Sequence, residues 1–380
     1  MGKCRKKIQQ NNSYRLKHKY MYKSVLKLKE KAFIIYKNVM PLAEFLKNER
    51  NLGVKLPPLK RMNLILHGYN SDKYALFDLS KKENFNNYIT DYQDRKKAYI
   101  NGSFKILLNN KLAFTYLFRN YVSVPECFYV IERGILIPLS NSYNLNGNPD
   151  IISLLHHKSK LILKPVARGR GEGLLRLEYT KKSYKINSEI CDREEVTNLI
   201  AKLDNYMVTE FIEQDDYAYQ LYPGSTNTIR IITMIDPQSI TPFLVTAFQR
   251  IGTKKSEPVD NTGAGGIVAF IDIRTGVLDG AYSYAQNIPG GCTLQENHPE
   301  TGSRIKGTII PEWTRIIKQV LEVSSYLSPF FKIIGWDILK TKKGITVIEC
   351  NNSPEFFFQH NSKIKSDQKV YNFFKHHGII

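Results

Sequence analysis

The stretch FFKIIGWDILKTKKGITVIECNNSPEFFF, residues 330–358, contains two runs that are rich in β-branched and aromatic residues. The runs are separated by a short Lys-Lys-Gly link. This pattern predicts two strands, Phe330 to Lys340 and Ile345 to Phe358, joined by a three-residue hairpin loop with Gly344 in the left-handed conformation. In this register Thr341 faces Ile345.

The predicted register brings two carboxylates together. Asp337 faces Glu349, and Asn351 lies beside Glu349 on the same face, because side chains on one face recur at every second residue. Like charges directly opposite each other destabilise a sheet. A divalent cation is the simplest compensation, and magnesium prefers such hard oxygen ligands. The alternative is a register shifted by one residue, with one carboxylate solvated at a frayed end.

The composition indicates a globular protein. At 380 residues with 42% hydrophobic content, the chain is long enough for two or three lobes with a sizeable core. No apolar run is long enough to span a membrane, and the N-terminus lacks the apolar core of a signal peptide. The five cysteines are scattered singly, which argues against a disulfide framework or a zinc site. We therefore expect a cytoplasmic protein.

The formal net charge of +20 is unevenly distributed. Residues 1–60 contain sixteen Lys or Arg against three Glu, a net charge of +13. Such a segment can bind nucleic acid or an anionic membrane surface. The alternative is a solvated helical face. Residues 14–46 have a helical pattern, and Pro41 and Pro57-Pro58 divide the segment, so two helices and a link are expected.

The next informative part precedes residue 140. Residues 107–121, which include Lys111, have a helical pattern, and the following VSVPECFYVIERGILIPL predicts a strand and a hairpin.

A glycine-rich loop lies within KLILKPVARGRGEGLLRLEY, residues 160–179. Three glycines at alternate positions allow the backbone to approach a ligand closely, and the nearby basic residues suit a polyphosphate. The order strand, loop, strand excludes a Walker loop and a dinucleotide-binding loop, which both open a helix. A flexible surface hairpin is the alternative. The loop residues are Lys164, Arg168, Gly169, Gly171 and Gly173.

Two strands follow the loop. YMVTEFIEQDD, residues 206–216, predicts a buried strand that ends in an acidic turn, an arrangement suited to an adenine edge and a ribose. STNTIRIITMI, residues 225–235, predicts a strand in which Arg230 interrupts the apolar run. The planar guanidinium suits carboxylate or phosphate oxygens. The alternative is an Arg on the solvent face of an edge strand.

Further polar loops lie between residues 250 and 302. The loop KKSEPVDNTGAGG contains Asn261 and predicts either a mobile cover over a site or a long hairpin connection. His298 is followed by Pro299 in a second polar loop, which indicates either a side chain near a ligand or a surface His. An amphipathic helix, IPEWTRIIKQVLEVSSYL, then precedes the opening hairpin.

In this order the motifs resemble the ATP-grasp superfamily, and most closely the sugar-transfer-associated ATP-grasp family of bacterial surface-polysaccharide biosynthesis. The resemblance covers about Asn63 to Gln359 and includes NNKLAF, LILKPVARGRGEG, NTIRIIT, VDNTGAGG, HPETG and GWDILKTKKGITVIECN. It implies an α+β ATP-grasp fold, in which two lobes with antiparallel sheets grip ATP. We expect a basic helical segment (1–60) outside the match, followed by an N-terminal lobe (61–150), a glycine-loop lid (151–212) and a C-terminal lobe with the metal site (213–380).

The resemblance also implies roles for individual residues. Lys111 and Lys164 would hold the α and β phosphates while Gly169 to Gly173 close over them, and Arg168 would also bind the nucleotide. Arg230, Lys164 and Asn227 are the expected catalytic residues, and Arg230, with Asn227, would face the transferred phosphoryl group and the acceptor carboxylate. The remaining expected contacts are Glu210, Phe211 and Ile212 with adenine, Asp215 or Asp216 with ribose, Thr228, Asn261 and His298 with the substrate, and Asp337, Glu349 and Asn351 with Mg²⁺.

The implied reaction is amide formation between a carboxylate and an amine through an acylphosphate, with ATP and Mg²⁺. An amino acid and a sugar acid or amino sugar of a capsule or lipopolysaccharide precursor are the expected substrates. Two alternatives are a kinase that phosphorylates a hydroxyl, and a basic nucleic-acid- or membrane-binding protein whose nucleotide site is degenerate. Of the partners of residues 1–60, the inner face of the membrane is expected over nucleic acid.

Overall fold

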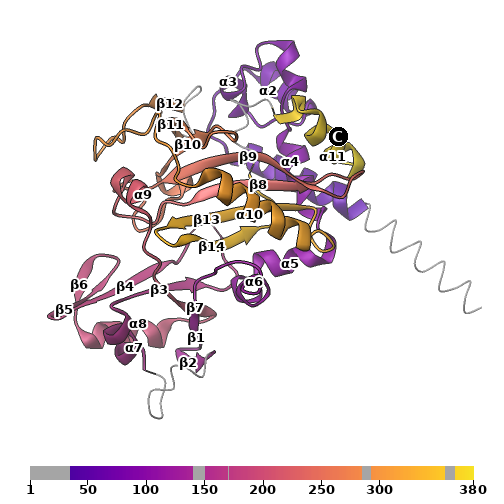
Figure 1. Cartoon of the computed structure of the whole chain (residues 1–380). Helices are drawn as coiled ribbons and strands as arrows, with labels where there is room; N and C mark the ends of the chain where they lie inside the picture. Colours follow the sequence, from indigo (N-terminus) through magenta and orange to yellow (C-terminus); the bar gives the residue numbers. More distant parts are fainter. Residues whose placement is uncertain (1–34, 140–149, 170, 285–291, 356–363) are drawn as a thin grey trace, which may run out of the picture.

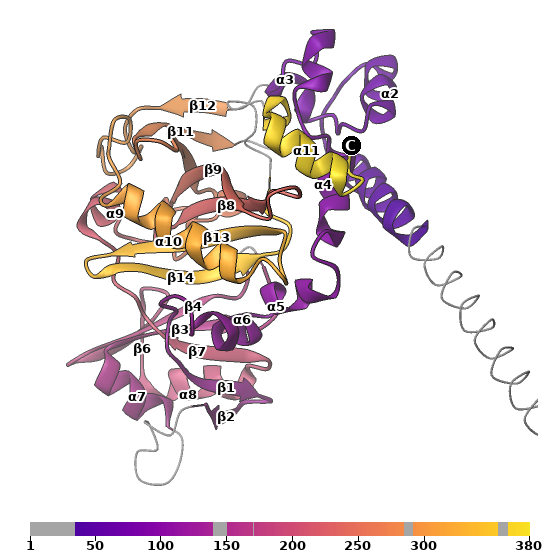
Figure 2. The same ribbon diagram turned by 45° about the vertical axis from the view of Figure 1, so that its right-hand side comes forward.

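The computed structural model describes residues 35–139, 150–169, 171–284, 292–355 and 364–380. Within these ranges, two antiparallel sheets of seven strands each lie one above the other, and helices cover them (Figure 1). A group of helices from the N-terminal part of the chain packs beside the second sheet (Figure 2). The predicted α+β class is confirmed.

The first sheet is formed by residues between 127 and 210. Its hydrophobic core lies between the sheet and two helices, α7 (Ile151–Lys158) and α8 (Arg193–Lys202). An Asp192–Glu195 capping box fixes the start of α8. In spatial order the strands are β2 (Ile135–Pro138), β1 (Cys127–Glu132), β7 (Tyr206–Glu210), β3 (Lys160–Pro165), β4 (Leu175–Thr180), β5 (Ser183–Ile186) and β6 (Glu189–Cys191).

The pairing of β1 with β7 changes one expected boundary. Residues 127–138 were expected in the N-terminal lobe, but they form the β1–β2 hairpin and extend the sheet of the glycine loop. The first sheet therefore begins before residue 151. The hairpin itself agrees with the sequence prediction.

The second sheet is formed by residues between 229 and 351. Its central strand β8 is buried at all seven positions, as expected for a strand that is covered on both faces. In spatial order the strands are β12 (Cys292–Gln295), β11 (Leu278–Tyr284), β10 (Ile267–Ile271), β9 (Pro242–Ile251), β8 (Ile229–Ile235), β13 (Ile333–Thr341) and β14 (Gly344–Asn351).

Helices complete the second lobe. The predicted amphipathic helix is α10 (Trp313–Tyr326), which buries Trp313, Ile316 and Val320 against the sheet. The helix expected over 107–121 divides at Asn110 into α5 (Lys105–Asn109) and α6 (Lys111–Phe118), because the Asn110 side chain accepts a hydrogen bond from Ala113 N and caps α6. A further short helix is α9 (Asp216–Leu221).

The remaining described helices pack beside the second sheet (Figure 2). They are residues 35–51, α2 (Pro58–Leu66), α3 (Lys73–Leu76), α4 (Asp91–Lys96) and α11 (Gln368–His376). Asn101 joins this group to the hairpin, since its Nδ2 donates to the carbonyl of Ile333 at 2.7 Å and to Asn352 Oδ1 at 3.0 Å. Of the described helices, none is long and apolar enough to cross a membrane.

The β13–β14 hairpin shows how the predicted carboxylate pair arises. Thr341 pairs with Gly344, so the loop contains two residues and the predicted three-residue loop was wrong. The register then shifts between Ile338, which pairs with Val347, and Asp337, which pairs with Glu349. The extra residue in β14 moves the register back by one, as a β-bulge does. The predicted pairing of Asp337 with Glu349 is therefore confirmed, although the loop was not.

Candidate active site

A cavity of about 320 Å³ lies between the two sheets. The first sheet contributes side chains of β3 and β7 and the glycine loop, and the second sheet contributes β8, β9, β13 and β14. Its walls combine apolar side chains with many charged ones from both sheets, which suits a charged small molecule. Most of the residues selected from the sequence line this cavity.

The carboxylates of the hairpin lie on the cavity side of the second sheet. Asp337 is fully buried, whereas Glu349 is partly exposed to the cavity. Asn351 shares their face, and its Nδ2 donates to Asp337 Oδ2 at 3.3 Å. The three residues expected to bind magnesium are thus brought together.

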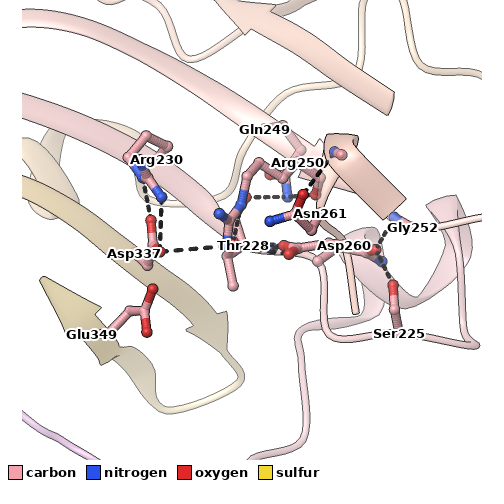
Figure 3. Close-up of polar contacts among 12 residues, drawn as sticks. Ser225, Thr228, Arg230, Gln249, Arg250, Gly252, Asp260, Asn261, Asp337 and Glu349 are labelled. Atoms are coloured by element: carbon pink, nitrogen blue, oxygen red, sulfur yellow. Dashed lines mark hydrogen bonds and ion pairs between the residues drawn. The ribbon is translucent and has the colours of Figure 1, made fainter. Parts of the chain in front are cut away.

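Arg230 is buried and paired, not exposed on an edge strand. It faces Asp337 across the β8–β13 pairing, where its Nε donates to Asp337 Oδ1 and its Nη2 donates to Asp337 Oδ2 at 3.0 Å (Figure 3). Two parallel donors on one carboxylate are the strongest form of ion pair in proteins. Arg230 therefore compensates the charge of the predicted metal ligand.

A second arginine, Arg250 in β9, extends this network (Figure 3). Its Nη2 lies 3.1 Å from Asp260 Oδ1 and 3.4 Å from Asp337 Oδ2, and its Nε donates to Thr228 Oγ1 at 2.9 Å. Asp260 Oδ2 in turn accepts from the backbone N–H and the hydroxyl of Thr228. Sequence reasoning missed Arg250 and Asp260, although Asp260 lies within the VDNTGAGG motif.

The buried charges shift each other's protonation. Burial alone would raise the pKa of Asp337, but Arg230 and then Arg250 outweigh it, and the pKa lies below its ordinary value. Burial opposes the charge of Arg250, but Asp260 and Asp337 outweigh it and raise the pKa of the guanidinium. Both groups therefore remain charged at neutral pH.

Two lysines from the opposite side face Glu349. Lys111 begins α6, and its Nζ donates to the carbonyl of Arg168 and lies 3.4 Å from Glu349 Oε2. Lys164 in β3 is buried, and its Nζ donates to the carbonyl of Ile348 at 3.4 Å. Burial lowers the pKa of Lys164 to about 8; Glu349 opposes this shift and Lys111 adds to it. A phosphate would relieve the repulsion between the two lysines.

The glycine loop runs from β3 to β4, as predicted, and borders the cavity. Gly171 and Gly173 have positive φ angles of +70° and +76°. A Cβ at Gly171 would lie 2.9 Å from Val259 Cγ1, a residue of the loop that carries Asp260 and Asn261. The loop therefore packs against the second lobe. Arg168 and Gly169 also line the cavity.

The end of β7 forms an apolar part of the cavity. Glu210, Phe211 and Ile212 line it together with Ile162 and Leu174. The Glu210 carboxylate accepts a hydrogen bond from the backbone N–H of Glu126 at 2.8 Å. Glu210 thus fixes the end of this strand, and the apolar surface beside it suits a planar base.

Five of the selected residues do not line the cavity, and one of them is Gly173 of the glycine loop. Asp215 caps α9 and lies 3.2 Å from Lys340, and Asp216 is exposed and pairs with Lys342. Neither is positioned to bind a ribose in this cavity. The other two are Asn227 and His298.

Asn227 points away from the cavity because Thr228 and Arg230 occupy the cavity side and strand side chains alternate. Its Nδ2 donates to the carbonyls of Ala218 and Tyr222, and its Oδ1 accepts from Ser225 Oγ and Gly252 N. It therefore holds the loops together beneath the site.

His298 is buried rather than near a ligand. Its ring stacks on Tyr222, its Nε2 contacts the carbonyl of Gly252 at 2.8 Å, and its Nδ1 accepts from the backbone N–H groups of Glu300 and Thr301. The polar composition of its loop gave no sign of this packing. Thr228 and Asn261, in contrast, do line the cavity.

Magnesium fits the donor set at the hairpin. Asp337, Glu349 and Asn351 provide two carboxylates and an amide oxygen, and Mg²⁺ usually completes its shell with phosphate and water oxygens. In the described part of the chain, no group of three or more His, Cys, Asp or Glu side chains could hold a metal. A metal here would therefore depend on Asn351 and on phosphate oxygens.

Two antiparallel sheets with this cleft and this glycine loop define an ATP-grasp fold. A family model described as sugar-transfer associated ATP-grasp matches residues 87–366, and the chain belongs to this family. The resemblance inferred from the sequence is thereby confirmed. No curated protein sequence matches the chain.

Solved structures are similar to the chain only at low sequence identity and low TM-score. The ADP complex of an N5-carboxyaminoimidazole ribonucleotide synthetase is 11% identical, with a TM-score of 0.41, over 73% of this chain and 52% of that one. D-alanyl-alanine synthetase A from Vibrio cholerae O1 biovar eltor is 10% identical, with a TM-score of 0.39, over 71% and 66%. An L-amino acid ligase from Bacillus licheniformis is 13% identical, with a TM-score of 0.35, over 80% and 52%. The chain thus spans less than two thirds of the length of each.

Proposed function

We propose that the protein is an ATP-dependent carboxylate–amine ligase. The observation that carries the proposal is that Lys111 and Lys164 meet the hairpin carboxylate Glu349 in one cavity. Cations together with a metal-binding carboxylate are what a nucleotide polyphosphate requires. Membership of an ATP-grasp family supports the same ligand.

The cavity suggests how ATP would lie. The phosphates would contact Lys111 and Lys164 beneath the glycine loop, and the base would lie on the apolar surface near Phe211 and Ile212. Magnesium, held by Glu349, Asn351 and Asp337, would neutralise charge on the phosphate oxygens. Because two arginines already pair with Asp337, Glu349 is the carboxylate that remains directed at the lysines.

The proposed reaction has two steps. An oxygen of the acceptor carboxylate attacks the γ-phosphorus, the bond to the β-phosphate bridging oxygen breaks, and ADP leaves. The nitrogen of the amine then attacks the acyl carbon, the carbon–oxygen bond to phosphate breaks, and the amine loses a proton to solvent. Lys164, Arg230 and Arg250 supply the positive field that lets the carboxylate approach the γ-phosphate.

We infer an amino acid and a sugar acid or amino sugar of a surface-polysaccharide precursor as the substrates. The name of the family associates it with sugar transfer, and this supports a sugar substrate. Thr228 and Asn261, which line the cavity near Arg250, are the proposed contacts for the acceptor.

Product masses test the reaction directly. The protein would be incubated with ATP, Mg²⁺ and a panel of amino acids paired with uronic acids or amino sugars, while ADP release is followed. A product equal to the two substrates minus one water supports the ligase. A product heavier than the acceptor by one phosphoryl group would show a kinase instead. Phosphate release without any amide across the panel, or no ADP release at all, would count against the proposal.

A further inference from the structure

The helix of residues 35–51 has two different faces. Phe45 and Glu49 point into the protein and are buried. Ile35, Val39 and Leu46 are 62%, 53% and 44% exposed, and Leu42 is 45% exposed. In a helix these four positions lie within roughly 60° of one another at 100° per residue. The helix therefore presents a continuous apolar strip outside the core.

This exposed face is wider than a coiled-coil contact. Tyr36 and Met40, which are 50% and 37% exposed, extend it to an arc of about 160°. A coiled coil buries a narrow strip of two positions in every seven. A half-apolar helix with aromatic residues is typical instead of segments that lie in the surface of a bilayer.

The neighbouring helix α2 repeats the pattern. Leu59, Met62 and Leu66 are 77%, 54% and 76% exposed and follow one face at spacings of three and four residues. Arg61 of α2 joins the two helices, since its Nε donates to Glu49 Oε1 at 2.7 Å and its Nη2 donates to the carbonyl of Glu49 at 2.8 Å. Two connected helices therefore leave apolar side chains uncovered.

Charge identifies the kind of surface that would cover these side chains. The described residues 35–66, which include both helices, contain six Lys or Arg against two Glu, a net charge of +4. Anionic lipids attract basic residues that lie near the bilayer surface. A nucleic acid would use the positive charge but would leave the apolar arc exposed to water.

We propose that the exposed face of residues 35–46 and α2, together with the exposed basic residues Lys47, Arg50, Lys55 and Lys60, binds an anionic lipid bilayer. The proposal does not depend on the ligase reaction. The two helices lie on the side of the molecule away from the junction of the two sheets (Figure 2). The cavity would therefore stay open while the protein is bound at the membrane.

Flotation with lipid vesicles tests the proposal. The full chain would be mixed with phosphatidylcholine vesicles with or without about 30% phosphatidylglycerol, at low and high salt. We expect flotation only with the anionic vesicles and a reduction at high salt. Val39→Asp/Leu46→Asp and Leu59→Asp/Leu66→Asp should each reduce partitioning at least about tenfold. Ile190→Asp in β6, at a side chain 76% exposed, is the matched control and should bind like wild type.

A measurement on the wild type alone makes the test independent of variant folding. Amide hydrogen exchange in residues 35–66 should slow when anionic vesicles are added. Unchanged exchange there, or equal flotation of the double variants and wild type, would overturn the proposal. Light scattering gives a further outcome. If wild type is a dimer that does not bind vesicles, and the double variants are monomers, the proposal is overturned and the face is assigned to a second copy of the chain.

Discussion

Arg230 of β8 and Asp337 of β13 face each other on neighbouring strands and form a buried ion pair with two hydrogen bonds (Figure 3). The sequence predicted both side chains in one site but assigned Arg230 to the phosphoryl group and the acceptor. In the structure Arg230 holds Asp337, and Arg250 approaches the same carboxylate from β9. The two arginines therefore set the charge of the site before any ligand binds.

Removing Arg230 should strongly destabilise the protein. Arg230→Ala leaves the buried carboxylate of Asp337 with Arg250 as its remaining arginine, and breaking a buried pair costs about 3–5 kcal/mol of unfolding free energy. Urea denaturation measures the loss. Arg274→Ala is the control, because Arg274 is 87% exposed and lies 4.0 Å from Asp272, so its loss should cost less than about 1 kcal/mol. Equal losses in the two variants would contradict the buried pair.

Lys164 should take up a proton when a nucleotide binds above pH 8. Burial lowers its pKa to about 8, so at pH 8.5 most of the unliganded protein has a neutral Lys164, and phosphate favours the charged form. Calorimetry of ADP binding in buffers of different ionisation enthalpy measures the uptake. Lys164→Arg should abolish it, since Arg stays charged. Identical uptake in wild type and variant would show that another group titrates.

The same pKa shift has a consequence for stability. Unfolding returns Lys164 to its ordinary pKa of 10.5. Between pH 8 and 10.5 the unfolded chain therefore binds more protons than the folded one, and this group increases stability as the pH rises. The free energy of unfolding of wild type relative to Lys164→Met should rise across this window. A fall would contradict the shift.

The glycine loop should tolerate a side chain at one position and not at another. Gly173→Ala places a Cβ 2.6 Å from the Tyr206 hydroxyl at a φ of +76°, whereas Gly169→Ala meets nothing within 4 Å. We expect a loss of about 1–3 kcal/mol in stability for Gly173→Ala and less than about 0.5 kcal/mol for Gly169→Ala. Thermal unfolding of both variants measures these losses in stability. A Gly173→Ala variant as stable as wild type would disprove this loop conformation.

Asn227 should matter for folding more than for ligand binding. Its side chain makes four hydrogen bonds to the loops beneath the site and does not line the cavity. Asn227→Ala should lower the free energy of unfolding by about 1–3 kcal/mol. Nucleotide affinity, measured below the unfolding transition, should change less than about threefold. A much larger loss of affinity in a fully folded variant would restore the contact expected from the sequence.

The hairpin shows how far local sequence rules reach. Strand propensity and alternation predicted Asp337 opposite Glu349, but the predicted loop was one residue too long, and a bulge in β14 offset the error. Local sequence does not reveal such a bulge, because its cause is the packing of the strand in the whole sheet. The pairing of Asp337 with Glu349 was thus predicted correctly because the error in loop length and the unpredicted bulge cancelled each other.

Contacts between distant strands could not be predicted. β8 lies between β9 and β13, and only this order places Arg230 against Asp337 and brings Arg250 near them. His298 was misplaced for a similar reason. Its polar loop indicated a side chain near a ligand or on the surface, but the ring packs on Tyr222. Residue type located the site, and the order of the strands decided which side chains meet within it.

The central claim is that the cavity between the sheets binds ATP with Mg²⁺. A nucleotide-binding measurement tests this claim most directly. Calorimetry with a non-hydrolysable ATP analogue, with and without Mg²⁺, would compare wild type with Lys164→Met, Glu349→Gln and the distant control Arg274→Gln. We predict that wild type and the control bind the analogue and that Mg²⁺ strengthens this binding. Lys164→Met should bind at least about tenfold more weakly, and Mg²⁺ should no longer strengthen binding by Glu349→Gln. Equal affinities and an equal Mg²⁺ effect in all four proteins, or no binding by wild type, would contradict the claim.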